Sequence, residues 1–143
     1  MSIVQGQTTA FKANVLSGLE NFTLTSPYTY KIALYTALAN LNNTTAAYTP
    51  VGEVATGNGY TAGGIPLTVS NPPTQDTANN VAWISFNNAT WPNSSITARG
   101  ALIYNSNTGA SVFVLNFGSD ITMNNFTVSF PTPTSTTAVL TIS

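Results

Sequence analysis

A succession of short segments rich in β-branched and aromatic residues constrains this chain most strongly. From residue 30 onward these segments last five to nine residues and alternate with stretches of Gly, Pro, Asn and Ser. This spacing is typical of antiparallel sheets that pack face to face, because each segment suits one strand and each break suits a turn. The expected strands are residues 30–36, 65–70, 81–86, 96–104, 112–117, 126–130 and 138–142. We therefore predict an all-β fold, an antiparallel β-sandwich or jelly-roll-like domain, as a single domain over residues 1–143.

The first twenty residues differ and predict an N-terminal arm followed by one short helix. Thr8 and Thr9 are candidate N-caps, because a threonine hydroxyl can accept a hydrogen bond from the first helical turn. The pattern predicts a helix over residues 10–19, and Gly18 indicates that its end is near. Its apolar stripe comprises Phe11, Val15, Leu16 and Leu19. Such a helix is typical of one that covers a sheet, and docking of the arm on a partner is the alternative.

The breaks between the segments carry their own signals. Residues 105–109 predict a hairpin loop with Gly109 in the left-handed region. Residues 57–64 are glycine-rich but lack the lysine of a phosphate-binding loop, so they indicate a turn. Residues 36–64 and 71–80 are expected to be long loops, and ordered long loops usually serve binding or assembly. Residues 131–137 are expected to connect two strands.

Charge is scarce, and this excludes several functions. The chain has 3 Lys or Arg and 4 Asp or Glu among 143 residues, which is 5% against about 25% in typical domains. Three basic residues are too few for a protein that tracks nucleic-acid phosphates. His and Cys are absent, and with them the usual zinc, haem and iron–sulfur ligands and the Ser–His and Cys–His nucleophile pairs. We expect no cofactor and no enzymatic activity.

The four carboxylates leave two minor alternatives open. No two of them are close in sequence, although the fold could bring a glycosidase-type pair together. A calcium site built mainly from carbonyl oxygens is the other alternative. The four are Glu20, Glu53, Asp76 and Asp120.

Arg99 is the only arginine and lies in the middle of an expected strand. We expect it to have a specific partner, either Asp120 or Glu53 in the same chain or a group of a neighbouring subunit. Trp83 and Trp91 are both more typical of a core than of a ligand platform, and a carbohydrate-binding platform of Trp91 with neighbouring tyrosines is an alternative. Trp91 precedes Pro92 in an expected loop, which favours a surface contact, because tryptophan is enriched at interface hot spots.

The N-terminus has no basic start and no apolar run, so we expect no signal peptide, and no stretch is long enough for a transmembrane helix. The missing charge is replaced by Thr, Asn and Ser, which number 24, 17 and 13. A neutral polar surface loses little on desolvation, and low net charge promotes association. The composition therefore favours an assembled structural protein over an enzyme.

Five strings carry a family resemblance. They are YKIALYT at 30–36, GEV at 52–54, GYTAGG at 59–64, ITARGALIYN at 96–105 and VFVLNFGSD at 112–120. Their order and spacing resemble a family of small virion-associated proteins of tailed bacteriophages, from the N-terminal helix almost to the last strand. One departure is Pro66 in GGIPLT, which indicates that this strand starts late or lies at a sheet edge.

The resemblance implies a virion structural protein. A capsid decoration or cement protein on the capsid surface is the first expectation, with the major capsid protein and copies of itself, in a trimer or dimer, as partners. A tail, baseplate or fibre component, or a receptor- or glycan-binding module, is the alternative; no nucleic acid or membrane is expected as a partner. From the residues themselves we expect contacts at 2–9 and 36–64. The individual candidates are Gln5, Thr8, Phe11, Tyr48, Tyr60, Trp91 and Arg99.

Overall fold

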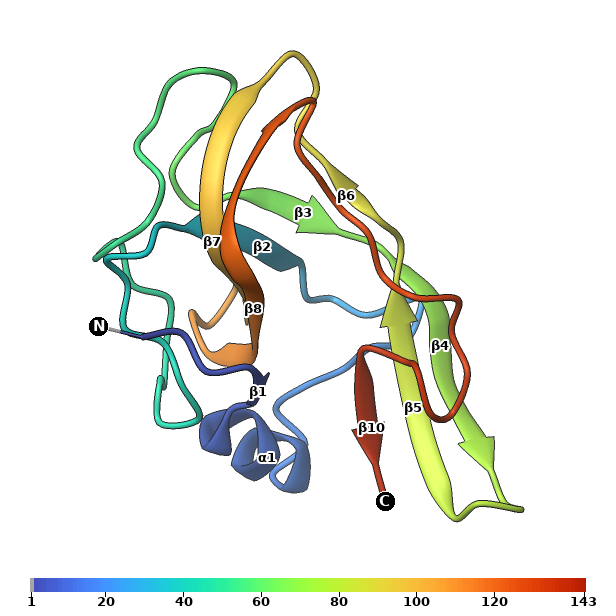
Figure 1. Cartoon of the computed structure of the whole chain (residues 1–143). Helices are drawn as coiled ribbons and strands as arrows, with labels where there is room; N and C mark the ends of the chain where they lie inside the picture. Colours follow the sequence, from blue (N-terminus) through green and yellow to red (C-terminus); the bar gives the residue numbers. More distant parts are fainter. Residues whose placement is uncertain (1) are drawn as a thin grey trace.

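The computed structural model describes residues 2–143 and shows an all-β, sandwich-like fold with one short helix (Figure 1). Strands account for 45% of the residues and helix for 6%. All pairs of strands are antiparallel. The accessible surface is 7293 Å², close to the ~7,000 Å² expected for a folded chain of 15 kDa. The predicted fold class is therefore confirmed.

The larger sheet has five strands in the order β1-β8-β7-β2-β3. Strand β2 lies inside it and reads as an almost unbroken apolar run, because both of its faces are covered. The long β7–β8 hairpin turns at residues 105–109, where Gly109 has a φ of +81°, as predicted. The strands are β1 (Gly6–Gln7), β2 (Tyr30–Tyr35), β3 (Ile65–Leu67), β7 (Ser95–Asn105) and β8 (Ser111–Asn124).

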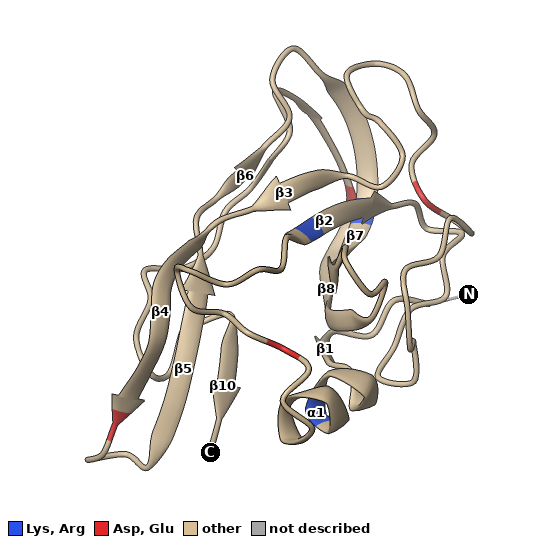
Figure 2. Ribbon diagram, turned by 180° about the vertical axis from the view of Figure 1, so that it is seen from behind, with Lys and Arg blue, Asp and Glu red and all other residues tan. Residues whose placement is uncertain are grey.

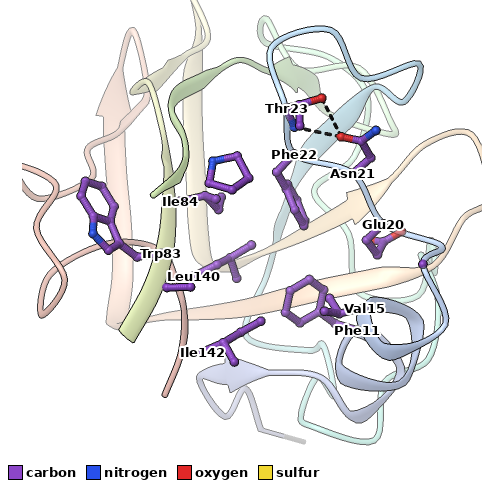
Figure 3. A pocket seen from close by; sticks show the side chains of 13 residues that line it. Phe11, Val15, Glu20, Asn21, Phe22, Thr23, Trp83, Ile84, Leu140 and Ile142 are labelled. Atoms are coloured by element: carbon purple, nitrogen blue, oxygen red, sulfur yellow. Dashed lines mark hydrogen bonds between the residues drawn. The ribbon is translucent and has the colours of Figure 1, made fainter. Parts of the chain in front are cut away.

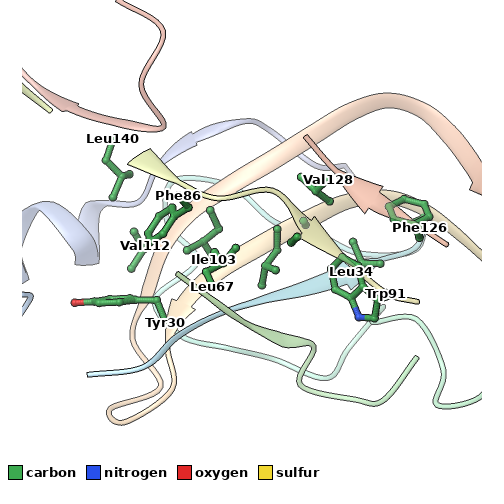
Figure 4. Packing of buried hydrophobic residues seen from close by; sticks show 14 of the residues in the cluster. Tyr30, Leu34, Leu67, Phe86, Trp91, Ile103, Val112, Phe126, Val128 and Leu140 are labelled. Carbon is green, nitrogen blue, oxygen red and sulfur yellow. The ribbon is translucent and has the colours of Figure 1, made fainter. Parts of the chain in front are cut away.

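Two smaller sheets complete the fold. Strands β10 (Leu140–Ile142), β5 (Val81–Phe86) and β4 (Val69–Asp76) form one, and β6 (Ala89–Thr90) and β9 (Thr127–Val128) form the other. The main core lies between these sheets and one face of the larger sheet (Figure 4). Its members come from all three sheets and include Tyr30, Leu34, Phe86, Trp91, Ile103, Val112, Phe126 and Leu140.

A second, smaller core covers the opposite face of the larger sheet. Ala33 and Tyr35 of β2 are fully buried there, although they point away from the main core. The N-terminal arm and the loop after β2 supply the cover, through Ile3, Ala39 and Leu41. The long loop predicted over residues 36–64 is thus an ordered layer of the fold.

The helix α1 (Thr9–Leu16) is shorter than the predicted 10–19. Thr8 is its N-cap, and the Thr8 hydroxyl oxygen accepts a hydrogen bond from the backbone N–H of Phe11 at 3.2 Å. Gly18, with a φ of +71°, turns the chain away after two helical turns. The predicted apolar stripe was too wide, because Phe11 is buried whereas the side chain of Leu16 is 90% exposed.

Three expectations about strands were wrong in extent. Residues 71–80 were expected to be a loop, but β4 runs through Pro72 and Pro73 to Asp76. A strand tolerates these prolines because β4 is an edge strand with irregular pairing, and Pro66 likewise lies in the edge strand β3, as predicted. β8 continues past the predicted 112–117 to Asn124 through a bulge. Of the predicted strand 126–130, only residues 127–128 pair, in β9.

Candidate contact surfaces

The charged residues are scattered singly over the molecule, with one exception (Figure 2). Each carboxylate has its own partners: Asn105 for Glu20, tyrosine hydroxyls for Glu53, Asn79 for Asp76 and Arg99 for Asp120. Within residues 2–143, no three His, Cys, Asp or Glu side chains are placed to hold a metal ion. No two carboxylates share a hydrogen-bond partner among residues 2–143.

Glu53 is the centre of a hydrogen-bonded network inside the long loop. Its Oε2 accepts from the hydroxyl of Tyr48 at 2.5 Å, and its Oε1 accepts from the hydroxyl of Tyr60 and the backbone N–H of Gly63, both at 2.6 Å. The hydroxyl oxygen of Tyr60 also accepts from the backbone N–H of Leu34 in β2 at 3.0 Å. The Glu53 carboxylate thus binds three parts of the loop, at residues 48, 60 and 63, and Tyr60 connects them to β2.

The surroundings of the tyrosine hydroxyls near Glu53 disfavour their ionisation. Burial raises the pKa of Tyr60 well above its ordinary value, and the hydrogen bond to Glu53 raises it further. Burial and Glu53 raise the pKa of Tyr48 in the same order. Protonated hydroxyls donating to a carboxylate make a stable arrangement rather than a reactive one. Glu53, Tyr60 and Gly63 of this network lie in the segments 52–54 and 59–64.

Gly64 lets the loop rest directly on β2. Its φ is +77°, and a Cβ atom added there would lie 1.8 Å from the carbonyl oxygen of Ile32. Only a residue without a Cβ fits, so the glycine-rich turn predicted over residues 57–64 ends in direct backbone contact with β2.

Arg99 forms the one ion pair of residues 2–143. Its Nη1 lies 3.3 Å from Oδ1 of Asp120, so one of the two partners expected within the chain is confirmed. Both side chains are accessible, at 39% and 56% exposure. Arg99 also lines a polar hollow of about 340 Å³ together with Ser2, Ile3, Ala37 and Asn116.

Two exposed apolar residues directly follow lining residues of this hollow in the chain. Val4 follows the lining residue Ile3 and is 54% exposed, and Leu38 follows the lining residue Ala37 and is 68% exposed. Arginine is enriched at interface hot spots, and association buries exposed apolar side chains favourably. We call the Arg99–Asp120 pair, the hollow that Arg99 lines, and the adjoining residues Val4 and Leu38 of the chain the Arg99 surface.

An apolar groove lies between α1 and the three-stranded sheet (Figure 3). It has a volume of about 350 Å³, and Phe11 and Phe22 face Ile84 and Leu140 across it. Trp83 of β5 is also among the residues that line the groove. It is only partly buried, contrary to the expectation that it lies in the core.

Glu20 is the only charged residue that lines the groove. Its Oε1 accepts a hydrogen bond from Nδ2 of the buried Asn105 at 2.9 Å, while Oε2 is buried without a hydrogen-bond partner in residues 2–143. Burial raises the pKa of Glu20, and the hydrogen bond from Asn105 opposes that effect. Glu20 therefore links the segment after α1 to the end of β7.

Four of the seven individual contact candidates lie inside the molecule. Their side chains pack within the chain's own cores or cap its helix, with exposures of 0–3%; they are Thr8, Phe11, Tyr60 and Trp91. For Trp91 the expectation of a surface loop was wrong, since its ring packs against Tyr60 and Phe126 at centroid distances of 6.1 and 6.2 Å.

The other three candidates remain accessible to different degrees. Gln5 is exposed, and its Oε1 accepts from the backbone N–H of Asn116 at 3.1 Å. Tyr48 is half-buried and stacks on Tyr104. Arg99 is accessible as described above. Val4 and Leu38 were not singled out, because nothing in the sequence distinguishes an exposed apolar loop residue from a buried one.

Comparison with protein-family models, curated proteins and solved structures finds no match to this chain. The helix in residues 2–143, eight residues long, is too short to cross a membrane. The assignment of function therefore depends on the residues and their geometry.

Proposed function

We propose that this chain is a structural protein of a bacteriophage virion, of the capsid decoration or cement type. It binds the outer face of the assembled shell, between major capsid subunits, and stabilises the head. The order and spacing of the five strings support the virion, and the surface supports an assembly role. No chemical reaction is part of the proposal.

The observation that carries the assembly role is the number of large apolar side chains on a nearly uncharged surface. Eight such residues in 2–143 are at least 40% exposed, more than the seven charged residues of the whole chain; they are Val4, Leu16, Leu19, Leu24, Leu38, Val51, Met123 and Ile142. Association buries such side chains favourably, and low net charge does little to oppose it. Neutral polar surroundings add only a small desolvation cost.

The places of the strings in the structure also support an assembly role. GEV and GYTAGG build the Glu53 network, and ITARGALIYN and VFVLNFGSD supply Arg99 and Asp120. One set of strings thus shapes a loop and the other carries an accessible ion pair.

The experiment that tests the proposal uses virions and virions stripped of this protein by urea or by mutation. We expect labelled antibody to mark the head in electron micrographs. Stripped particles should release DNA at a lower temperature, and re-addition of the purified protein should reverse the change. A label on the tail with unchanged heat stability of the head would overturn the cement role and favour the tail or receptor-binding alternative.

A further inference from the structure

The Arg99–Asp120 ion pair contributes little to the stability of the fold. Both side chains are accessible, and they meet through a single contact of 3.3 Å. Exposed pairs of this kind typically contribute about 0–1 kcal/mol. The chain nevertheless places two of its seven charges here. Stability of the monomer is therefore a poor explanation for this pair, and a contact outside the chain is a better one.

The strand geometry presents both charges outward. Ala98 pairs with Ile121 and Gly100 pairs with Asn116, so that one residue of β7, Arg99, stands opposite four residues of β8. Bulges of this kind re-aim side chains and interrupt strand pairing. On the other side of β7, the pairing with β2 ends at Gly100. Arg99 therefore lies one residue beyond the part of β7 that pairs with β2.

Each partner of the pair keeps unused hydrogen-bonding capacity. Arg99 has five N–H donors, and only Nη1 makes a hydrogen bond within residues 2–143. Asp120 accepts through Oδ1 and has no partner at Oδ2 there. A positive and a negative group thus lie side by side, each able to bind a second partner of opposite charge.

Such a surface is complementary to itself. A twofold axis next to the pair relates two copies so that the positive group of each copy meets the negative group of the other. Val4 and Leu38, 54% and 68% exposed, follow lining residues of the hollow, and burying them would favour association. We propose that the Arg99 surface joins two copies of this chain around a twofold axis, with Arg99 of each copy bound to Asp120 of the other.

This inference rests on the proposed function, because copies of a decoration protein lie next to one another on the shell. The two can nevertheless fail separately. Self-association is measured on the purified chain in solution, whereas the place in the virion is measured on particles. A dimer formed by a protein located on the tail would keep the inference and overturn the cement role.

The test uses two charge reversals, Arg99→Asp and Asp120→Arg, studied alone and mixed by sedimentation velocity over a range of concentrations. We expect the natural chain to dimerise. Each variant alone should associate at least tenfold more weakly, because four like charges then meet at the axis. An equimolar mixture should recover dimers, since one copy carries two negative and the other two positive groups.

The mixture separates a contact between copies from the pair within one chain, because mixing does not change either chain internally. A natural chain that stays monomeric, or a mixture that associates no better than its components, would overturn the inference. Lys31→Asp and Asp76→Lys serve as matched reversals elsewhere on the surface and should leave dimerisation unchanged. Circular dichroism shows whether each variant is folded.

A pair of apolar variants tests the border of the surface. Leu38→Ser should weaken dimerisation several-fold, whereas Leu24→Ser should not, although Leu24 is similarly exposed at 71%. Equal effects of the two variants would contradict the assignment of this face.

Discussion

The hydroxyl oxygen of Tyr60 accepts a hydrogen bond from the backbone N–H of Leu34 at 3.0 Å, 26 residues earlier in the chain. Leu34 lies in β2 and is fully buried, so its N–H has no access to water. The same hydroxyl donates to Glu53. A loop side chain therefore completes the hydrogen bonding of a buried strand, and the loop and the sheet depend on each other.

Tyr60→Phe should destabilise the protein by about 2–3 kcal/mol, because the buried N–H of Leu34 loses its acceptor and Glu53 loses a donor. Unfolding in urea measures the change. Tyr28→Phe is the control, since the hydroxyl of Tyr28 makes no hydrogen bond within residues 2–143 and its loss should change stability little. Equal effects of the two variants would mean that the Tyr60 hydroxyl has no special role.

Gly64→Ala should cost at least about 3 kcal/mol, because the new Cβ would overlap the carbonyl oxygen of Ile32 and the loop would have to move off β2. Gly109→Ala isolates the cost of the backbone conformation, since Gly109 has a similar φ of +81° but nothing within 4 Å of the added atom. That variant should lose only about 1–2 kcal/mol. Thermal unfolding of both variants checks the difference between them.

Thr8→Ala should cost about 1–2 kcal/mol, because helix α1 loses its N-cap. Thr8→Ser keeps the hydroxyl and should retain most of the stability. Thr9→Ala changes an exposed neighbour and should stay within about 0.5 kcal/mol of the natural chain. Chemical unfolding followed by circular dichroism gives all three values, and a loss for Thr9→Ala as large as for Thr8→Ala would contradict the capping role.

Glu20 should stabilise the folded chain more at acidic pH than at neutral pH. Burial raises its pKa in the folded chain above the ordinary value, so protonation favours folding. The stabilisation is complete at pH values below the ordinary carboxyl pKa and is lost as the pH rises through the folded pKa. The melting temperature of the natural chain should therefore rise relative to Glu20→Gln as the pH falls from about 7 to about 4.

Asp76 provides a control of opposite sign. Hydrogen bonds from Asn79 and Ser135 lower its pKa, so its ionised form favours folding. Relative to Asp76→Asn, the natural chain should lose stability as the pH falls through that lowered pKa. Thermal unfolding of both variants at several pH values checks the two signs, and parallel curves for natural chain and variant in either case would contradict the corresponding shift.

The fold class could be predicted because β-type segments and turn residues alternate so regularly along the chain. The extents of the strands were harder to predict. β4 contains Pro72 and Pro73, which local patterns assign to a loop, and only the tertiary arrangement places this strand at an edge. Gly118 interrupts the pattern of β8, yet the strand resumes beyond the bulge.

The candidate surfaces were predicted only in part. Arg99 could be singled out because it is the only arginine, and scarcity of charge made each remaining charge informative. Trp91 was placed wrongly, because a tryptophan beside a proline does not reveal that the adjacent chain folds back over the core. The exposure of Leu38 depends on contacts between distant segments, which one sequence does not display.

The prolines in the edge strands affect how copies of the chain can pack against one another. Pro66 in β3 and Pro72 and Pro73 in β4 remove backbone donors at the outer strands of two sheets. A chain with so little repulsive charge would otherwise be prone to extend these sheets from molecule to molecule into fibres. The opposite outer strands, β1 and β10, are short and contain no proline. At the proline-bearing edges, close packing therefore has to use side-chain surfaces instead of backbone pairing, which favours finite assemblies over fibres.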